Sequence, residues 1–146
     1  MFEASIQEVV ALAVLMPVVA SMGGIAGSQV LTVVIRGMAL GQVEKRNATR
    51  LLLHELMVGA INSVFWAVVV GLVAYTWFDS WALGIIVGVA LVLNVLVAAV
   101  AGALIPMLLR RLSIDPALAG GVILTTVTDV IGFVAFLGLG TIFLLR

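Results

Sequence analysis

The sequence contains no cysteine and few charged residues, and each shortage excludes a class of protein. Without cysteine the chain has no disulfide, no thiolate metal site and no cysteine nucleophile. Charged residues make up 10% of its 146 residues, against roughly a quarter in a soluble globular domain. Seven basic residues balance seven acidic ones, so no basic surface is present and nucleic acid is excluded as a partner.

Apolar residues are in large excess. They form 64% of the chain, and the mean hydropathy is +1.37, so a soluble fold could not cover its surface. Four apolar stretches reach the length of about 20 residues that a helical membrane span needs. They are residues 9–35, 56–77, 82–109 and 117–145. We therefore predict an all-α integral membrane protein in contact with membrane lipids, with one transmembrane domain over residues 1–146 and no soluble regulatory domain.

Basic residues predict the orientation of these spans. They gather in the first and third connections, at Arg36, Lys45, Arg46, Arg50, Arg110 and Arg111. The positive-inside rule then places both connections in the cytoplasm and both ends of the chain outside a cell inner membrane that it crosses several times. An exterior N-terminus without a basic export signal is unusual. We therefore expect that one further span precedes these four in the complete protein.

Asp129 is the one ionisable residue deep within a span. It lies about 18 Å along the last helix, near the middle of the bilayer. A carboxylate there costs about 3 kcal/mol on insertion scales and marks a functional site by default. Thr125 and Thr126 share its helical face, and Gly132 is expected to leave that face open to a partner or to water. The alternative is a protonated or hydrogen-bonded aspartate that serves packing.

The first span contains Pro17 and the pair Gly23-Gly24, which weaken a helix. A local break there would free carbonyl groups to face an ion, provided that protein or water covers them. Alternatively, Gly23-x-x-x-Gly27 is a helix-packing face. The sequence does not separate these two interpretations.

The other polar residues predict structure rather than chemistry. Asn62, Ser63 and Asn94 are expected to form hydrogen bonds between helices. His54 has no second ligand at zinc spacing. The sequence has no nucleophile–base pair and no phosphate-binding loop, so we predict that the chain is not an enzyme.

One carboxylate per chain attracts a cation but does not neutralise a divalent one. Two copies related by a two-fold axis would supply two charges, and such dimers are the commonest assembly. Carboxylate, hydroxyl and carbonyl oxygens suit a hard cation, and Mg²⁺ in particular keeps several of its waters. These considerations leave Mg²⁺, Ca²⁺, Mn²⁺ and H⁺ open.

Several motifs, in order along nearly the whole chain, resemble the MgtE family of magnesium channels and transporters. The first region resembles that family's second helix through Gly23-Gly24-x-x-Gly27-x-Gln29 and Arg36-Gly37-x-Ala39-Leu40-Gly41. The last region resembles its fifth helix through Asp115-Pro116-Ala117-Leu118-Ala119 and Thr125-Thr126-Val127-Thr128-Asp129.

The resemblance implies a homodimeric Mg²⁺ pore domain between the second and fifth helices of both protomers, with the family's first span and cytoplasmic sensing domains missing here. It further implies that Asp129 holds the hydrated ion as transported cargo. Backbone near Gly24 and Thr125 would face the same ion, and Asp115 would serve a second ion site on the cytoplasmic side.

The chain departs from the family at the expected filter. Ile25 replaces an asparagine that commonly follows the paired glycines, and Ser28 and Gly121 stand where asparagine is often found. We include Ser28 among the predicted metal-site residues. Fewer side-chain amides there make the strictness of Mg²⁺ selection an open question.

Two other functions remain compatible with the sequence. A lone intramembrane acid also suits a proton-coupled carrier. The glycine faces could instead serve assembly in a membrane subunit that transports nothing.

Overall fold

The computed structural model describes residues 2–43 and 47–144. This part of the chain forms four helices, α1 (Phe2–Ala39), α2 (Ala48–Phe78), α3 (Trp81–Arg111) and α4 (Pro116–Phe143), with no strand. All four are long and apolar enough to cross a membrane, which confirms the predicted all-α membrane fold. The predicted spans were too short at the α1–α2 connection, because both helices continue through interfacial residues beyond the apolar stretch.

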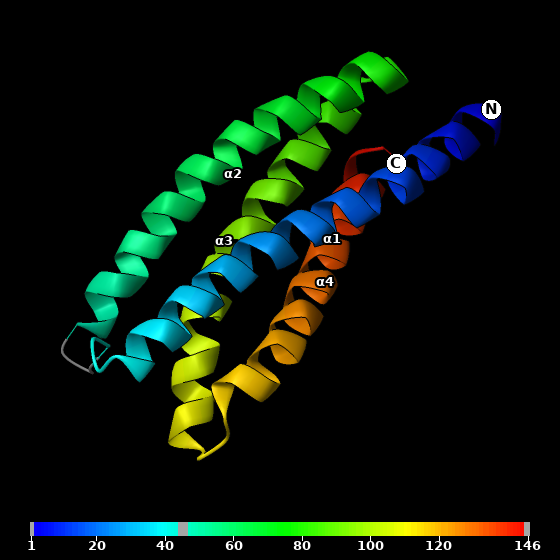
Figure 1. Cartoon of the computed structure of the whole chain (residues 1–146). Coiled ribbons are helices and arrows are strands. Elements are labelled where there is room, and N and C mark those ends of the chain that lie inside the picture. Colours follow the sequence, from blue (N-terminus) through cyan, green and yellow to red (C-terminus); the bar gives the residue numbers. More distant parts are fainter. Residues whose placement is uncertain (1, 44–46, 145–146) are drawn as a thin grey trace.

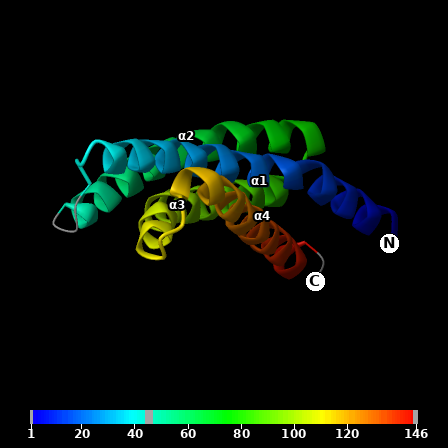
Figure 2. The same cartoon turned by 60° about the horizontal axis from the view of Figure 1, so that its bottom comes forward.

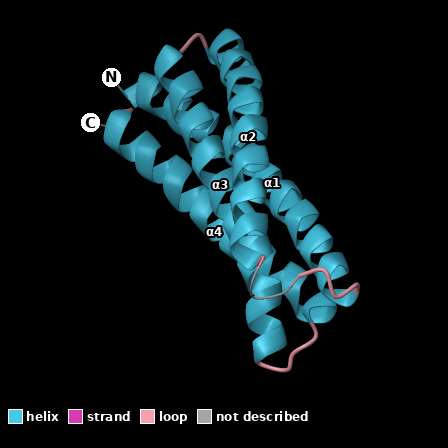
Figure 3. Ribbon diagram, turned by 90° about the vertical axis from the view of Figure 1, so that its left-hand side faces the viewer, coloured by secondary structure: helices cyan, strands magenta, loops and turns pink. Residues whose placement is uncertain are grey.

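The helices alternate in direction, so their connections collect at two ends of the bundle (Figure 1). The α1–α2 and α3–α4 connections lie together at one end, and both termini lie with the α2–α3 turn at the other (Figure 3). That turn is tight. Asp79 takes a left-handed conformation with φ of 50°, and the Ser80 hydroxyl accepts a hydrogen bond from the Leu83 N–H as the N-cap of α3.

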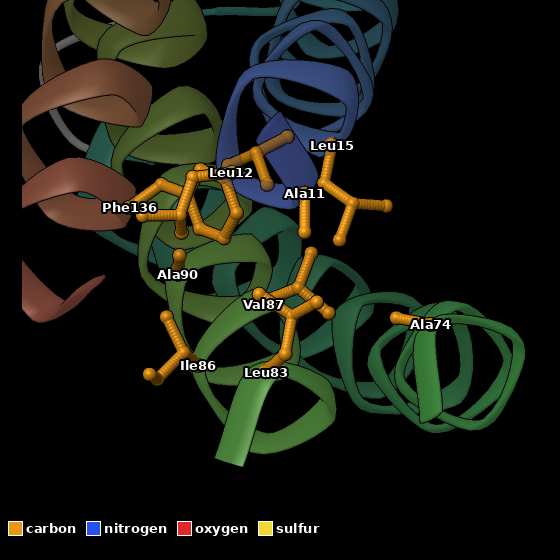
Figure 4. Close-up of a cluster of buried hydrophobic side chains, with 10 residues drawn as sticks. Ala11, Leu12, Leu15, Ala74, Leu83, Ile86, Val87, Ala90 and Phe136 are labelled. Atoms are coloured by element: carbon orange, nitrogen blue, oxygen red, sulfur yellow. The ribbon is translucent and has the colours of Figure 1, made fainter. Parts of the chain in front are cut away.

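Helix α3 is the centre of the bundle and packs against the other three, whereas α1 and α2 hardly touch. Helix α1 crosses the bundle obliquely (Figure 2), so its N-terminal half lies beside the end of α4 and its C-terminal end beside the start of α2. A cluster of buried side chains joins α1, α3 and α4 near the termini, with Leu12, Val87 and Phe136 at its centre (Figure 4). Helix α2 contributes Ala74 to this cluster.

Glycines let the backbones approach where no side chain would fit. A Cβ on Gly102 of α3 would lie 2.6 Å from the Gly27 carbonyl oxygen of α1, and one on Gly84 would lie 2.7 Å from that of Gly71. Close approach of this kind strengthens dispersion contacts between helices in lipid, where no hydrophobic force acts. Gly84 and Gly102 are therefore packing residues.

Helix α1 is continuous through Pro17 and the paired glycines. The predicted local break is wrong, because loss of one backbone donor is tolerated within a long membrane helix. Gly23 and Gly27 are buried against Asn94 and Leu124, so the packing interpretation of this motif holds.

Candidate ion site between α1 and α4

An open groove of about 730 Å³ runs between α1 and α4. Most of its lining side chains are small or polar, in contrast to the apolar core beside it. From α1 the groove is lined by Ala20, Ser21, Gly24, Ile25, Ser28, Gln29, Thr32 and Val33, and from α4 by Thr125 and Asp129. The spacing of three and four residues along each helix explains why these residues share one face.

Asp129 lies at the middle of the 28-residue α4 and is exposed in the groove. Among the described residues, none forms an ion pair or a side-chain hydrogen bond with its carboxylate. Within the described residues, the hydrogen bond between helices that the packing alternative included is therefore not present.

The threonine hydroxyl groups that line the groove donate their protons to backbone carbonyl oxygens. Thr125 Oγ1 donates to the carbonyl oxygens of Gly121 and Val122, at 3.0 and 3.1 Å. Across the groove, Thr32 Oγ1 donates to the Ser28 carbonyl oxygen at 2.8 Å. A hydroxyl whose proton is bound to the backbone can offer only oxygen lone pairs to the groove. These threonines therefore present acceptors, which suit a cation or the protons of its water shell.

Gly24 and Ser28, both predicted as metal-site residues, line this groove. A Cβ on Gly24 would meet only Thr128 Oγ1, at 3.8 Å, so this glycine borders open space rather than a packed neighbour. Because α1 is an unbroken helix, the backbone near Gly24 keeps its helical hydrogen bonds. The expectation that a break frees carbonyl groups for the ion is thus wrong, and any backbone contact with an ion's water shell must use the second lone pair of a helical carbonyl oxygen.

Asp115 lies outside the groove, at the start of α4. Its Oδ1 accepts the Ala117 N–H at 2.9 Å, and Pro116 occupies the first helical position, so Asp115 is the N-cap of this helix. The site is about 21 Å from Asp129 along the helix axis, at 1.5 Å per residue. The two acids therefore cannot hold one ion together.

The prediction that Gly132 leaves the helical face of Asp129 open is wrong. Gly132 is buried, and a Cβ there would lie 2.7 Å from Asn94 Nδ2 and 3.4 Å from the Ala20 Cα. The Asn94 side chain, itself fully buried, donates to the Val19 carbonyl oxygen of α1 at 2.8 Å. This confirms the interhelical bond predicted for Asn94, which fills the space between α1 and α4 behind the groove.

Asn62 and Ser63, for which the same kind of bond as that of Asn94 was predicted, behave differently. Ser63 is buried but donates to the Ala60 carbonyl oxygen of its own helix, at 2.9 Å, and Asn62 is exposed. The prediction that both residues form hydrogen bonds between helices was wrong. The Ser63 hydroxyl reaches the backbone of its own helix more easily than that of a neighbouring helix.

Ser21, Gln29 and Thr32 line the groove but were not assigned to the site from the sequence. The signal was their spacing from Gly24 and Ser28, which puts them on one face of α1. It was not decisive, because the same periodicity describes any face of a helix.

Comparison with known proteins identifies the family. Residues 16–139 match the family model for MgtE, described as a divalent cation transporter. The chain is 34% identical to the magnesium transporter MgtE of Bacillus subtilis and 36% identical to that of Thermus thermophilus, each over 98% of its length. It spans about a third of these relatives, 32% of each. Because the matched family is one of transporters, the prediction that the chain is not an enzyme holds. A match over most of the helical bundle, with Asp129 inside it, shows that the chain belongs to the MgtE family.

Proposed function

We propose that two copies of this chain form a pore that passes a hydrated divalent cation, Mg²⁺, along the groove and past Asp129. The observation that carries the proposal is the exposed carboxylate at the middle of a membrane-spanning helix, in a groove with oxygen acceptors. Similarity to proteins named magnesium transporters supports Mg²⁺ as the cargo.

A second copy is needed because of where the groove lies. A charge facing lipid at that depth costs about 3 kcal/mol, and polar side chains there normally face a bundle interior or a water-filled cavity. Two-fold symmetry would close the open side of the groove with an identical surface and bring two Asp129 carboxylates to one axis. Within the described residues no three acidic or histidine side chains gather to hold a metal, so a single chain lacks the charge for a divalent ion.

The lining favours a cation that keeps its water. Gly24 leaves space, and the threonine hydroxyls present acceptors that can bind the protons of coordinated water. Mg²⁺ is held in this way, through one or two carboxylates and several retained waters. Two facing carboxylates would repel each other unless a cation lies between them, so ion occupancy and dimer stability should rise together.

The bundle geometry supports the proposed orientation. The helix ends that carry Arg36, Arg50, Arg110 and Arg111 adjoin the α1–α2 and α3–α4 connections, which lie at the same end (Figure 1). The positive-inside rule places that end in the cytoplasm and the termini outside, in a cell inner membrane. Asp115 also lies at this end, where its exposed carboxylate could contact an ion that leaves the groove.

The test is Mg²⁺ flux into proteoliposomes that contain a fluorescent Mg²⁺ indicator, measured with and without a proton gradient. Asp129→Asn keeps the size of the side chain but removes both charges from the axis. We expect it to insert and dimerise, and to lose at least about 90% of the flux, since a net charge in a low-dielectric site contributes well over 1.4 kcal/mol. Asp79→Asn, in the exposed turn, is the matched control and should conduct normally.

Wild-type flux in Asp129→Asn at matched protein levels would contradict the proposal. Flux that requires a proton gradient would favour the proton-coupled carrier, and no flux from a verified wild-type dimer would favour a subunit that does not transport.

A further inference from the structure

A second hollow, of about 620 Å³, is lined by residues from the end of α1 and the start of α2. These two helix ends lie side by side at the lower left of Figure 1. We call it the arginine hollow, after Arg36 from the last turn of α1 and Arg50 from the first turn of α2. His54 also lines it, four residues after Arg50 and therefore on the same helical face. Three nitrogen-bearing side chains from two helices thus converge on one space.

Among the described residues, no carboxylate pairs with the two arginines of the hollow. In the part of the chain that the structure describes, the one ion pair is that of His54 with Glu55, at 3.4 Å. Neither arginine has a carboxylate partner there. Guanidinium groups prefer planar or tetrahedral oxyanions, which they bind through two parallel hydrogen bonds.

The start of α2 adds a second attraction for an anion. Asn47 is its N-cap residue, but its side chain makes no capping bond and instead donates to the Gln42 carbonyl oxygen at 2.6 Å. The first turn of α2 carries no acidic residue. The positive end of the helix dipole is therefore uncompensated by side chains of that turn, beside Arg50.

The hollow also has apolar lining residues. Val33 and Leu51 line it on the side nearer the centre of the bundle, since each lies further into its helix than Arg36 or Arg50, whereas Leu40 lies beyond Arg36 on the outer side. The hollow lies at the limits of two candidate spans, Val10–Ala39 and Thr49–Phe78, and so at the depth of lipid headgroups. A ligand that fits both the arginines and this apolar lining has an anionic group at the interface and a hydrocarbon chain below it.

From this arrangement we propose that the arginine hollow binds the phosphate of an anionic phospholipid, with Arg36 and Arg50 as the phosphate ligands and an acyl chain against Val33 and Leu51. Because α1 and α2 hardly pack against each other, a lipid held by both arginines would join these two helices. It would hold the end of α1, the helix that forms one wall of the groove. Lipid binding here is independent of whether cations pass that groove.

The test measures thermal unfolding of the detergent-purified protein with added phosphatidylglycerol or phosphatidylcholine, together with retained lipid by native mass spectrometry. We expect phosphatidylglycerol to raise the melting temperature and phosphatidylcholine to have little effect. The variant Arg36→Gln/Arg50→Gln should lose this difference, and Arg50→Gln alone should weaken lipid retention about fivefold, as for one basic residue near an anionic surface. Both side chains are exposed, so folding should be unaffected.

The matched control is Arg110→Gln/Arg111→Gln, which removes the same charge from the other connection at the same end. It should keep the preference for phosphatidylglycerol. Equal loss in this control would show general attraction to anionic lipid and overturn the proposal. Equal stabilisation by water-soluble glycerol phosphate would also overturn it, since the hollow would then hold a free anion and not a lipid.

Discussion

Asp129, Thr125 and Asn94 show how differently polar side chains can be used inside one membrane bundle. Asp129 keeps its carboxylate unpaired within the described chain and directs it into the groove. Thr125 binds its own helix and offers lone pairs. Asn94 is fully buried and donates to a neighbouring helix, while its Oδ1 has no hydrogen-bond partner among the described residues. The role of each side chain follows from which of its polar atoms remains without a hydrogen bond to the rest of the described chain.

At this scale the hydroxyl of Thr125 should matter for conduction. Thr125→Val keeps the shape of the side chain but removes an acceptor from the groove, so Mg²⁺ flux should fall about fivefold, as for one hydrogen bond of about 1 kcal/mol. Thr126→Val is the matched control. Thr126 makes a similar bond, to the Val122 carbonyl oxygen at 2.8 Å, but does not line the groove. Equal losses in both variants would mean that the effect comes from the helix and not from the groove.

At the scale of the helices, α3 determines how α1 and α4 are spaced. Gly27 and Gly102 bring α1 against α3, and Gly23 and Gly132 leave room for Asn94 between the helices. The groove in front is therefore held by contacts behind it. Any change in that packing should alter the distance between Gly24 and Asp129 without touching either residue.

Truncating Asn94 tests this coupling. Asn94→Ala removes the bond to Val19 and leaves a cavity among three helices, so we expect a loss of about 2 kcal/mol in the free energy of unfolding. The loss would appear as a lower melting temperature of the detergent-purified protein. Asn62→Ala, at an exposed position of α2, should change it little. If both variants melt like the wild type, Asn94 does not hold the helices in place.

For the whole molecule, large apolar side chains are exposed on all four helices, and the groove between α1 and α4 adds polar ones. Helix α2 presents large apolar side chains such as Ile61, 72% exposed, which suit lipid. The α1–α4 side presents the groove, whose polar side chains do not suit lipid. The proposed two-fold axis therefore lies on the α1–α4 side.

Because the chain has no cysteine, single introduced cysteines can map that axis. Ile25→Cys places a thiol at the groove, where Ile25 is 55% exposed, and Ile61→Cys places one on the outer face of α2. A short bis-maleimide should link the first variant into dimers in membranes and leave the second monomeric, as judged by gel electrophoresis. Dimers from Ile61→Cys alone would move the interface to α2.

The four spans could be predicted from the sequence alone, and Asp129 could be singled out as a candidate, because hydropathy and helical periodicity are local properties. A carboxylate in an apolar run stands out whatever packs beside it. Only the tertiary structure decided which glycines pack against another helix and which border the groove. Gly23 packs while Gly24 borders the groove, and Gly132 is buried although it is only three residues from Asp129. The physical reason is that the crossing of α1 over α3 and α4 determines which face of each helix is covered, and that crossing depends on residues far apart in the chain.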